Sequence, residues 1–144
     1  DYCRVNIKGD DVWLVKPQNY MNQSGPPVRA MLDYYRLKPK DLLVAHDEID
    51  LPPGTVRLKQ GGGHGGHNGI RDVIRHCGAD FMRLRIGVGH PGEKDKVTGY
   101  VLKRASSDME AAVEKNVDEA IDVMPLLLDD GLNAAMKALH TKEN

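Results

Sequence analysis

Short apolar segments separated by polar loops are the main pattern in the first two thirds of the chain. Continuous or alternating apolar positions predict four strands, at 12–15, 42–45, 55–59 and 81–88. Lys16-Pro17 closes the first of them, because proline has no N–H to donate to a continuing strand. The second is followed directly by the polar residues His46, Asp47 and Glu48. Open α/β sheets place their sites at such strand ends, so this position is the first candidate site.

Apolar residues spaced three and four apart predict helices between and after these strands. The apolar stripes run over 28–35, 70–74, 109–124 and 132–139. Asn68 is positioned to cap the second helix, and Ser107 with Glu110 has the form of a capping box for the third. Pro125 is expected to kink or end that third helix. Strands that alternate with helices favour a single α/β domain with a mixed or parallel sheet.

The composition excludes several classes of protein. The chain has 144 residues, enough for one domain with its own core, and no apolar stretch approaches the roughly 20 residues of a membrane span. Cys3 and Cys77 are far apart in the sequence, so neither a disulfide framework nor a zinc site is expected. We therefore expect a protein of the reducing cytoplasm with no membrane partner.

The net charge of −1 hides an uneven distribution along the chain. Residues 54–104 hold ten Lys or Arg and four acids, a net +6, whereas residues 105–144 hold three Lys and nine acids, a net −6. Basic side chains gathered in one region favour a surface that binds phosphates. Solvated helix and strand faces of mixed charge explain the same counts equally well.

The segment from Gly61 to Gly69 combines six glycines with His64, His67 and Asn68. Bare backbone lets a ligand approach closely and can point amides towards it. A flexible surface loop is the alternative, but polar side chains set among glycines favour a functional segment. The segment lacks the Gly-Lys-Ser/Thr ending of a P-loop and the spacing of a dinucleotide fingerprint, which disfavours nucleotide triphosphate chemistry.

A metal site is the main rival interpretation of these polar residues, since imidazoles and carboxylates bind zinc or manganese. It would combine both histidines of the glycine segment with the polar residues after the second strand: His64, His67, His46, Asp47, Glu48 and Asp50. No helical face aims the two loop histidines at one ion, so no metal site is predicted. Asp47 is placed to orient a histidine and stabilise its cation, or simply to cap a loop. Asn22 offers a donor and an acceptor to a peptide-like ligand, although an Asx turn is the simpler explanation.

Four ordered motifs resemble the bacterial peptidyl-tRNA hydrolase family: Lys16-Pro17 with Tyr20 to Gly25, Val44 to Gly54, Gly61 to Gly69, and Arg83 to Pro91. The resemblance runs from about Val12 to His140. It implies one three-layer α/β/α domain over residues 1–144 with a twisted mixed sheet, a monomeric state and no metal or organic cofactor. It also implies hydrolysis of the ester that joins a peptide to the 3′ ribose of tRNA, with peptidyl-tRNA as the partner.

The resemblance also assigns roles within the catalytic site. Asp47 is expected to orient the histidine that acts as general base on water. Asn22 and Asn68 are expected to hold the peptide backbone, the water and the developing oxyanion. Three further positions are expected to contact the substrate: Tyr20, Met21 and His67.

The basic middle of the chain fits the same resemblance. Lys59 and Arg85 match the basic pair that holds the 5′ phosphate of tRNA in this family. Arg57 and Lys103 are weaker candidates, chosen from charge alone.

One part of the family pattern has no counterpart in the sequence. It comprises an N-terminal strand, a Gly-Asn-Pro-Gly turn and an Arg-His-Asn element. The general-base histidine belongs to that element, so its role passes to none of the six histidines of this chain. Because the chain begins with Asp1 rather than methionine, we expect a piece of a longer enzyme whose sheet is incomplete at the N-terminus. The alternatives are a non-catalytic RNA-binding relative of the same fold and, third, a metal-dependent hydrolase.

Overall fold

The computed structural model describes residues 2–7, 9–16, 23–89 and 107–141. Tyr20, Met21 and Asn22, predicted as site residues, lie outside these ranges, as does Lys103. Contacts within the chain define two compact units. Unit 1 is Asp1–Leu43 with Gln60–Met82, and unit 2 is Val44–Lys59 with Arg83–Asn144. That the two units form the single domain expected from the sequence stays a prediction.

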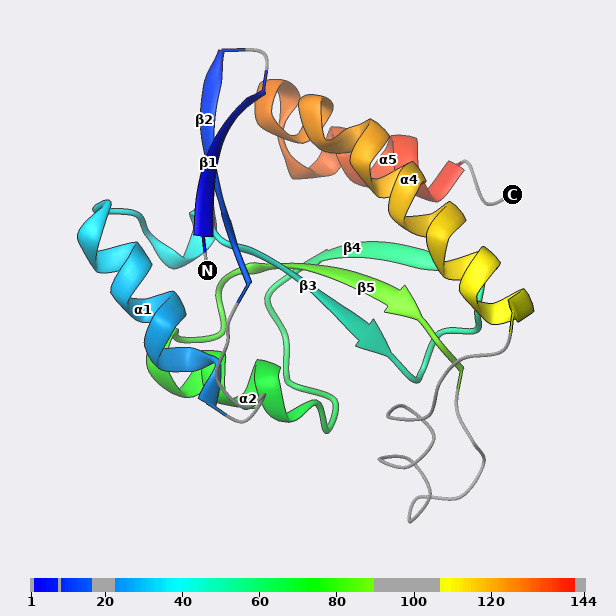
Figure 1. Ribbon diagram of the computed structural model, residues 1–144, viewed down its shortest axis with the longest axis horizontal. Coiled ribbons are helices and arrows are strands. Elements are labelled where there is room, and N and C mark those ends of the chain that lie inside the picture. The colour runs from blue at the N-terminus through cyan, green and yellow to red at the C-terminus, as the bar shows by residue number, and fades with distance from the viewer. Residues whose placement is uncertain (1, 8, 17–22, 90–106, 142–144) are drawn as a thin grey trace. The chain divides into compact units, whose positions relative to one another are not determined.

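Unit 1 begins with a two-stranded hairpin, drawn in blue in Figure 1. β1 (Tyr2–Ile7) pairs antiparallel with β2 (Asp10–Val15), so that Tyr2 lies opposite Val15 and Ile7 opposite Asp10. The side-chain oxygen of Asn6 accepts a hydrogen bond from the Gly9 amide at 2.9 Å and closes the turn. β1 was not predicted, although its alternation of apolar and polar side chains is typical of a strand.

Two helices form the core of unit 1, and they lie side by side in Figure 1. α1 (Gly25–Tyr34) begins at the proline pair, and its predicted apolar stripe buries Val28 and Leu32. α2 (Asn68–Cys77) buries Ile70, Val73 and Cys77. A short 3₁₀ turn, η2 (Pro39–Asp41), follows α1. The helices predicted for this half of the chain are therefore confirmed.

The first residue of α1 is fixed by a side chain of α2. The Asp72 carboxylate accepts a hydrogen bond from the Gly25 amide at 2.7 Å, which satisfies one of the free N–H groups at the start of α1. A Cβ atom at position 25 would lie 2.5 Å from the carbonyl oxygen of Asp72 and would also collide with the ring of His76. Only glycine lets the two helices approach this closely.

A three-stranded sheet, most of whose residues belong to unit 2, has the strand order β3-β5-β4. Its strands are β3 (Leu43–Glu48), β4 (Val56–Gln60) and β5 (Met82–Gly87). Met82 N donates to Leu42 O, and Val88 N donates to Glu48 O. The residue numbers of both partners increase in the same direction, so β3 and β5 are parallel. The hydrogen bonds from Gly61 N to Phe81 O and from Gly87 N to Thr55 O advance in opposite directions, so β4 and β5 are antiparallel. The expected mixed sheet is confirmed.

Two C-terminal helices pack on each other in unit 2 (Figure 1). They are α4 (Ser107–Asp130) and α5 (Leu132–Thr141). The fully buried Asn116 of α4 donates to the carbonyl of Gly54 at 3.1 Å, and His140 of α5 accepts from the amide of Leu58 at 3.1 Å. These two bonds tie the helices to β4 and to the turn before it. None of the helices in the described part of the chain combines the length and apolar character that a membrane span requires.

Of the two outcomes expected at Pro125, a kink or an end of the third helix, the end does not occur, because α4 continues to Asp130 and stops only at Gly131. Proline inside a helix costs about 3 kcal/mol, since one backbone hydrogen bond is lost and its ring crowds the preceding turn. Ala120 and Val123 before the proline are buried, and Leu126 and Leu127 after it are half-buried. Apolar packing on both sides of Pro125 is sufficient to offset that cost.

Candidate active site

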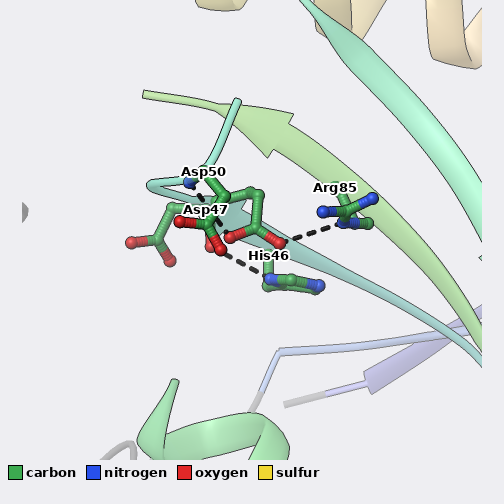
Figure 2. Close-up of polar contacts among 5 residues, drawn as sticks. His46, Asp47, Asp50 and Arg85 are labelled. Atoms are coloured by element: carbon green, nitrogen blue, oxygen red, sulfur yellow. Dashed lines mark hydrogen bonds and ion pairs between the residues drawn. The ribbon is translucent and has the colours of Figure 1, made fainter. Parts of the chain in front are cut away.

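The strand predicted over 42–45 continues to Glu48, so the polar residues expected after it are the last residues of β3. Figure 2 shows this part of the chain with His46, Asp47, Asp50 and Arg85 labelled. We call His46, Asp47, Glu48, Asp50 and Arg85 the strand-end cluster. Arg85 on β5 donates from Nε to the Glu48 carboxylate at 2.9 Å, and both side chains are largely withdrawn from solvent. The second carboxylate oxygen of Glu48 accepts from the backbone amide of Asp50 at 3.3 Å. Glu48 thus links the turn after β3 to the neighbouring strand.

His46 is oriented by the main chain of its neighbour. Its Nδ1 lies 2.9 Å from the backbone carbonyl oxygen of Asp47. A carbonyl oxygen only accepts, so Nδ1 of His46 carries the proton in this bond. Asp47 is half-buried near the end of β3, and its side-chain carboxylate takes no part in that contact.

The glycine segment of unit 1 forms a loop that is stabilised by hydrogen bonds between residues close in sequence. Gly62 and Gly66 adopt φ values of 103° and 83°, a region that favours glycine. The amide of Gly66 donates to Nδ1 of His64 at 2.9 Å, and the amide of Ile70 donates to Nδ1 of His67 at 3.2 Å. Backbone amides therefore fix both imidazole rings.

These two bonds determine where each loop histidine carries its proton. A ring nitrogen that accepts from an amide has no hydrogen, so the neutral rings of His64 and His67 are protonated at Nε2. A protonated Nε2 can donate to a ligand but cannot bind a metal ion. Within residues 2–7, 9–16, 23–89 and 107–141, no three His, Cys, Asp or Glu side chains lie together in a group that could hold a metal.

Asn68 was predicted to cap α2, but it does not. His67 takes that place, because its backbone is extended and its Nδ1 reaches the amide three residues on. Asn68 is instead the first residue of the helix, with an exposed side chain whose oxygen accepts from Nη2 of Arg71 at 3.1 Å. Asn68 therefore lies at the surface, and the residue that caps α2 is His67.

The two predicted phosphate-binding residues both belong to unit 2. Lys59 is exposed on β4, whereas Arg85 on β5 is half-buried and paired with Glu48. The two β4–β5 hydrogen bonds set a register in which Arg57 lies directly opposite Arg85, so Arg57 is at least as well placed as Lys59 to act with it. Arg83, two residues earlier on β5, is 3% exposed, and burial lowers the pKa of its guanidinium.

Comparison with known proteins matches the whole of this chain to one family. The family model described as peptidyl-tRNA hydrolase covers residues 1–144. The chain belongs to the peptidyl-tRNA hydrolase family. The peptidyl-tRNA hydrolase of Xanthomonas euvesicatoria pv. vesicatoria is 52% identical over 142 residues, which are 98% of this chain and 74% of that protein. The one from Stenotrophomonas maltophilia is 51% identical over 140 residues, 96% of this chain and 73% of that protein.

Solved structures of peptidyl-tRNA hydrolases agree with the sequence comparison. The crystal structure of the enzyme from Acinetobacter baumannii superposes with a TM-score of 0.92 at 46% identity, covering 95% of this chain and 70% of that one. A complex of peptidyl-tRNA hydrolase with N-propanol gives the same values. The resemblance found in the four motifs and the expected α/β fold are both confirmed.

The comparisons leave the individual site residues as predictions. Asp47, Lys59 and Arg85 belong to unit 2, whereas His67 and Asn68 belong to unit 1. The histidine bonds and the contacts of Glu48 and Arg71 were not foreseen from the sequence. Arg71 could have been found, because it lies three residues after Asn68 in a predicted helix and so shares its face.

Proposed function

We propose that this protein hydrolyses the ester bond between the peptide and the tRNA of peptidyl-tRNA and releases free tRNA. The observation that carries this proposal is the family match over residues 1–144, together with relatives about half identical in sequence that are themselves named peptidyl-tRNA hydrolases. The relatives and structures named above all bear that name, so they favour the enzyme over a non-catalytic RNA-binding relative.

Ester hydrolysis requires a base that activates the attacking water and donors that stabilise the oxyanion formed at the carbonyl carbon. Oxygen of water bonds to the peptide's carbonyl carbon, the bond from that carbon to the 3′ oxygen of ribose breaks, and the ribose oxygen takes up a proton. Asp47 would orient the base that removes the water's proton, and an ionised carboxylate stabilises a cationic base. That base is assigned to none of the six histidines in the chain.

Amide side chains supply the other requirement. Asn22 and Asn68 would hold the peptide backbone and donate to the oxyanion, where one preset donor is worth about 100-fold in rate. Tyr20, Met21 and His67 would complete the peptide-binding surface. The Nε2–H of His67 is consistent with a donor role, since its other ring nitrogen is occupied by the helix.

Binding of the tRNA would rest on the basic residues of unit 2. Lys59 and Arg85 would hold a phosphate, with Arg57 as their neighbour on β4. A phosphate contact of this kind releases counterions, so affinity should fall as salt rises. The proposal includes action as a monomer in the cytoplasm, with no metal or organic cofactor required.

The test follows the oxygen of water. Purified protein is incubated with N-acetyl-aminoacyl-tRNA in water enriched in ¹⁸O, and both products are examined by mass spectrometry. We expect ¹⁸O in the carboxylate of the released acyl group and a full-length tRNA that an aminoacyl-tRNA synthetase charges again. Failure to release the acyl group, or release of a shortened tRNA, would contradict ester hydrolysis.

A further inference from the structure

Asn68 has a partner that decides which way its amide faces. Asn68 is the first residue of α2, and Arg71 lies three residues later on the same face of the helix. Nη2 of Arg71 and the side-chain oxygen of Asn68 are 3.1 Å apart, a normal hydrogen-bond distance. Both residues are exposed, so this contact forms at the surface where a substrate could reach it.

The chemistry of arginine fixes the orientation of the amide. A guanidinium has only donors, so the atom of Asn68 that faces it must be the oxygen and not the nitrogen. Turning the amide over would set its N–H groups against those of Arg71. The amide nitrogen, with its two hydrogens, therefore points away from the guanidinium.

The backbone beneath this amide is fixed as well. His67 caps α2 through the Ile70 amide at 3.2 Å, and the Arg71 amide donates to the His67 carbonyl at 3.0 Å. Asn68 thus begins a regular helical turn, and its main-chain angles are set by that turn. With its side-chain oxygen held by Arg71 as well, the amide keeps both N–H groups available to donate.

We propose that Arg71 is a positioning residue for the reaction, which holds the Asn68 amide with its N–H groups available to the carbonyl oxygen of the peptidyl ester. The inference rests on the proposed function of Asn68 and adds the residue that aims it. Arg71 itself touches no reacting atom in this scheme. Its loss leaves Asn68 in place but lets the amide turn.

The experiment compares two arginines of the same helix. Arg75 lies one turn beyond Arg71, is exposed, and forms no hydrogen bond or ion pair with the residues that the structure describes. Arg71→Met and Arg75→Met each remove one positive charge, so any effect of charge on tRNA binding appears in both. We expect kcat of peptidyl-tRNA hydrolysis to fall about fivefold in Arg71→Met only, with KM equal in the two variants, because one exposed charged hydrogen bond is lost.

Two further variants separate positioning from other roles. Arg71→Lys still offers a donor to the Asn68 oxygen and should restore kcat to within about twofold of wild type. In an Asn68→Ala background, Arg71→Met should change kcat no more than Arg75→Met does, since no amide remains to be aimed. In ¹⁵N relaxation measurements, the Asn68 side-chain amide should become more mobile in Arg71→Met and stay ordered in Arg75→Met.

The outcomes distinguish this inference from the function on which it rests. If Asn68→Ala is slow but Arg71→Met matches Arg75→Met in kcat, Arg71 does not position the amide and the inference is overturned. If Asn68→Ala itself keeps wild-type turnover, the role of Asn68 in the proposed function is wrong, and the role of Arg71 is overturned with it.

Discussion

The two units fix their candidate site residues by different means. In unit 1, amides and side chains two or three residues away hold the loop histidines and Asn68. In unit 2, Glu48 at the end of β3 is held by Arg85, which is 37 residues further along the chain. The loop geometry is therefore set by a short stretch of sequence, whereas the strand-end cluster exists only once β3 and β5 have paired. Substitutions in the loop should change chemistry first, and substitutions in the cluster should change stability as well.

The largest effect expected in the loop is that of Asn68→Asp. The new carboxylate still accepts from Arg71 but has no N–H to offer, so hydrolysis of peptidyl-tRNA should slow about 100-fold with little change in stability. Single-turnover rates and urea unfolding measure the two quantities. Asn133→Asp, at an exposed position of α5, adds the same charge and should leave both unchanged. A rate for Asn68→Asp within twofold of wild type would show that no donor is needed there.

Gly25→Ala tests whether unit 1 depends on anything beyond local contacts. The added Cβ would collide with Asp72 and His76 of α2, and we expect the free energy of unfolding to fall by about 2 kcal/mol. The matched control is Gly63→Ala in the loop, where a Cβ meets no atom within 4 Å. Urea denaturation of both variants decides the matter. Equal stabilities for the two would mean that α1 and α2 do not meet as closely as described.

Glu48→Ala should destabilise unit 2 by about 1.5 kcal/mol, because it leaves a partly buried guanidinium without its carboxylate. Asp33→Ala breaks the Arg29–Asp33 pair of α1, whose side chains are 49% and 61% exposed. That pair should contribute less than about 0.5 kcal/mol. The two urea midpoints measure the contrast. A cost for Glu48→Ala no greater than that for Asp33→Ala would remove the difference between the two units.

The smallest effect expected is a pH dependence from His140. Burial, and secondly the charge of Arg57, lowers the pKa of this histidine in the folded protein. The unfolded chain then binds the proton first as pH falls below about 6.5, so stability present at pH 7 is lost towards pH 5. His140→Gln still accepts from Leu58 but does not titrate, and should lose less stability between these pH values than wild type. A loss in His140→Gln identical to that of wild type would exclude His140 as the source.

Local signals account for what the sequence revealed correctly. The apolar stripe of α1 and the approximate place of β3 each depend on neighbours in sequence. The cap of α2 was misassigned because His67 and Asn68 both fit the start of a helix, and only backbone geometry separates them. The Gly25–Asp72 and Glu48–Arg85 bonds join residues 47 and 37 positions apart, so no periodicity could reveal them.

The most direct test of the account is the rate at which purified protein deacylates peptidyl-tRNA, measured for wild type and Asp47→Ala under single-turnover conditions. Loss of the carboxylate that orients the base should slow the reaction about 1,000-fold. Asp50→Ala, which removes an exposed carboxylate from the same turn, should stay within about twofold of wild type. A wild-type protein that releases no tRNA, or an Asp47→Ala variant as fast as wild type, would contradict the proposed catalytic site.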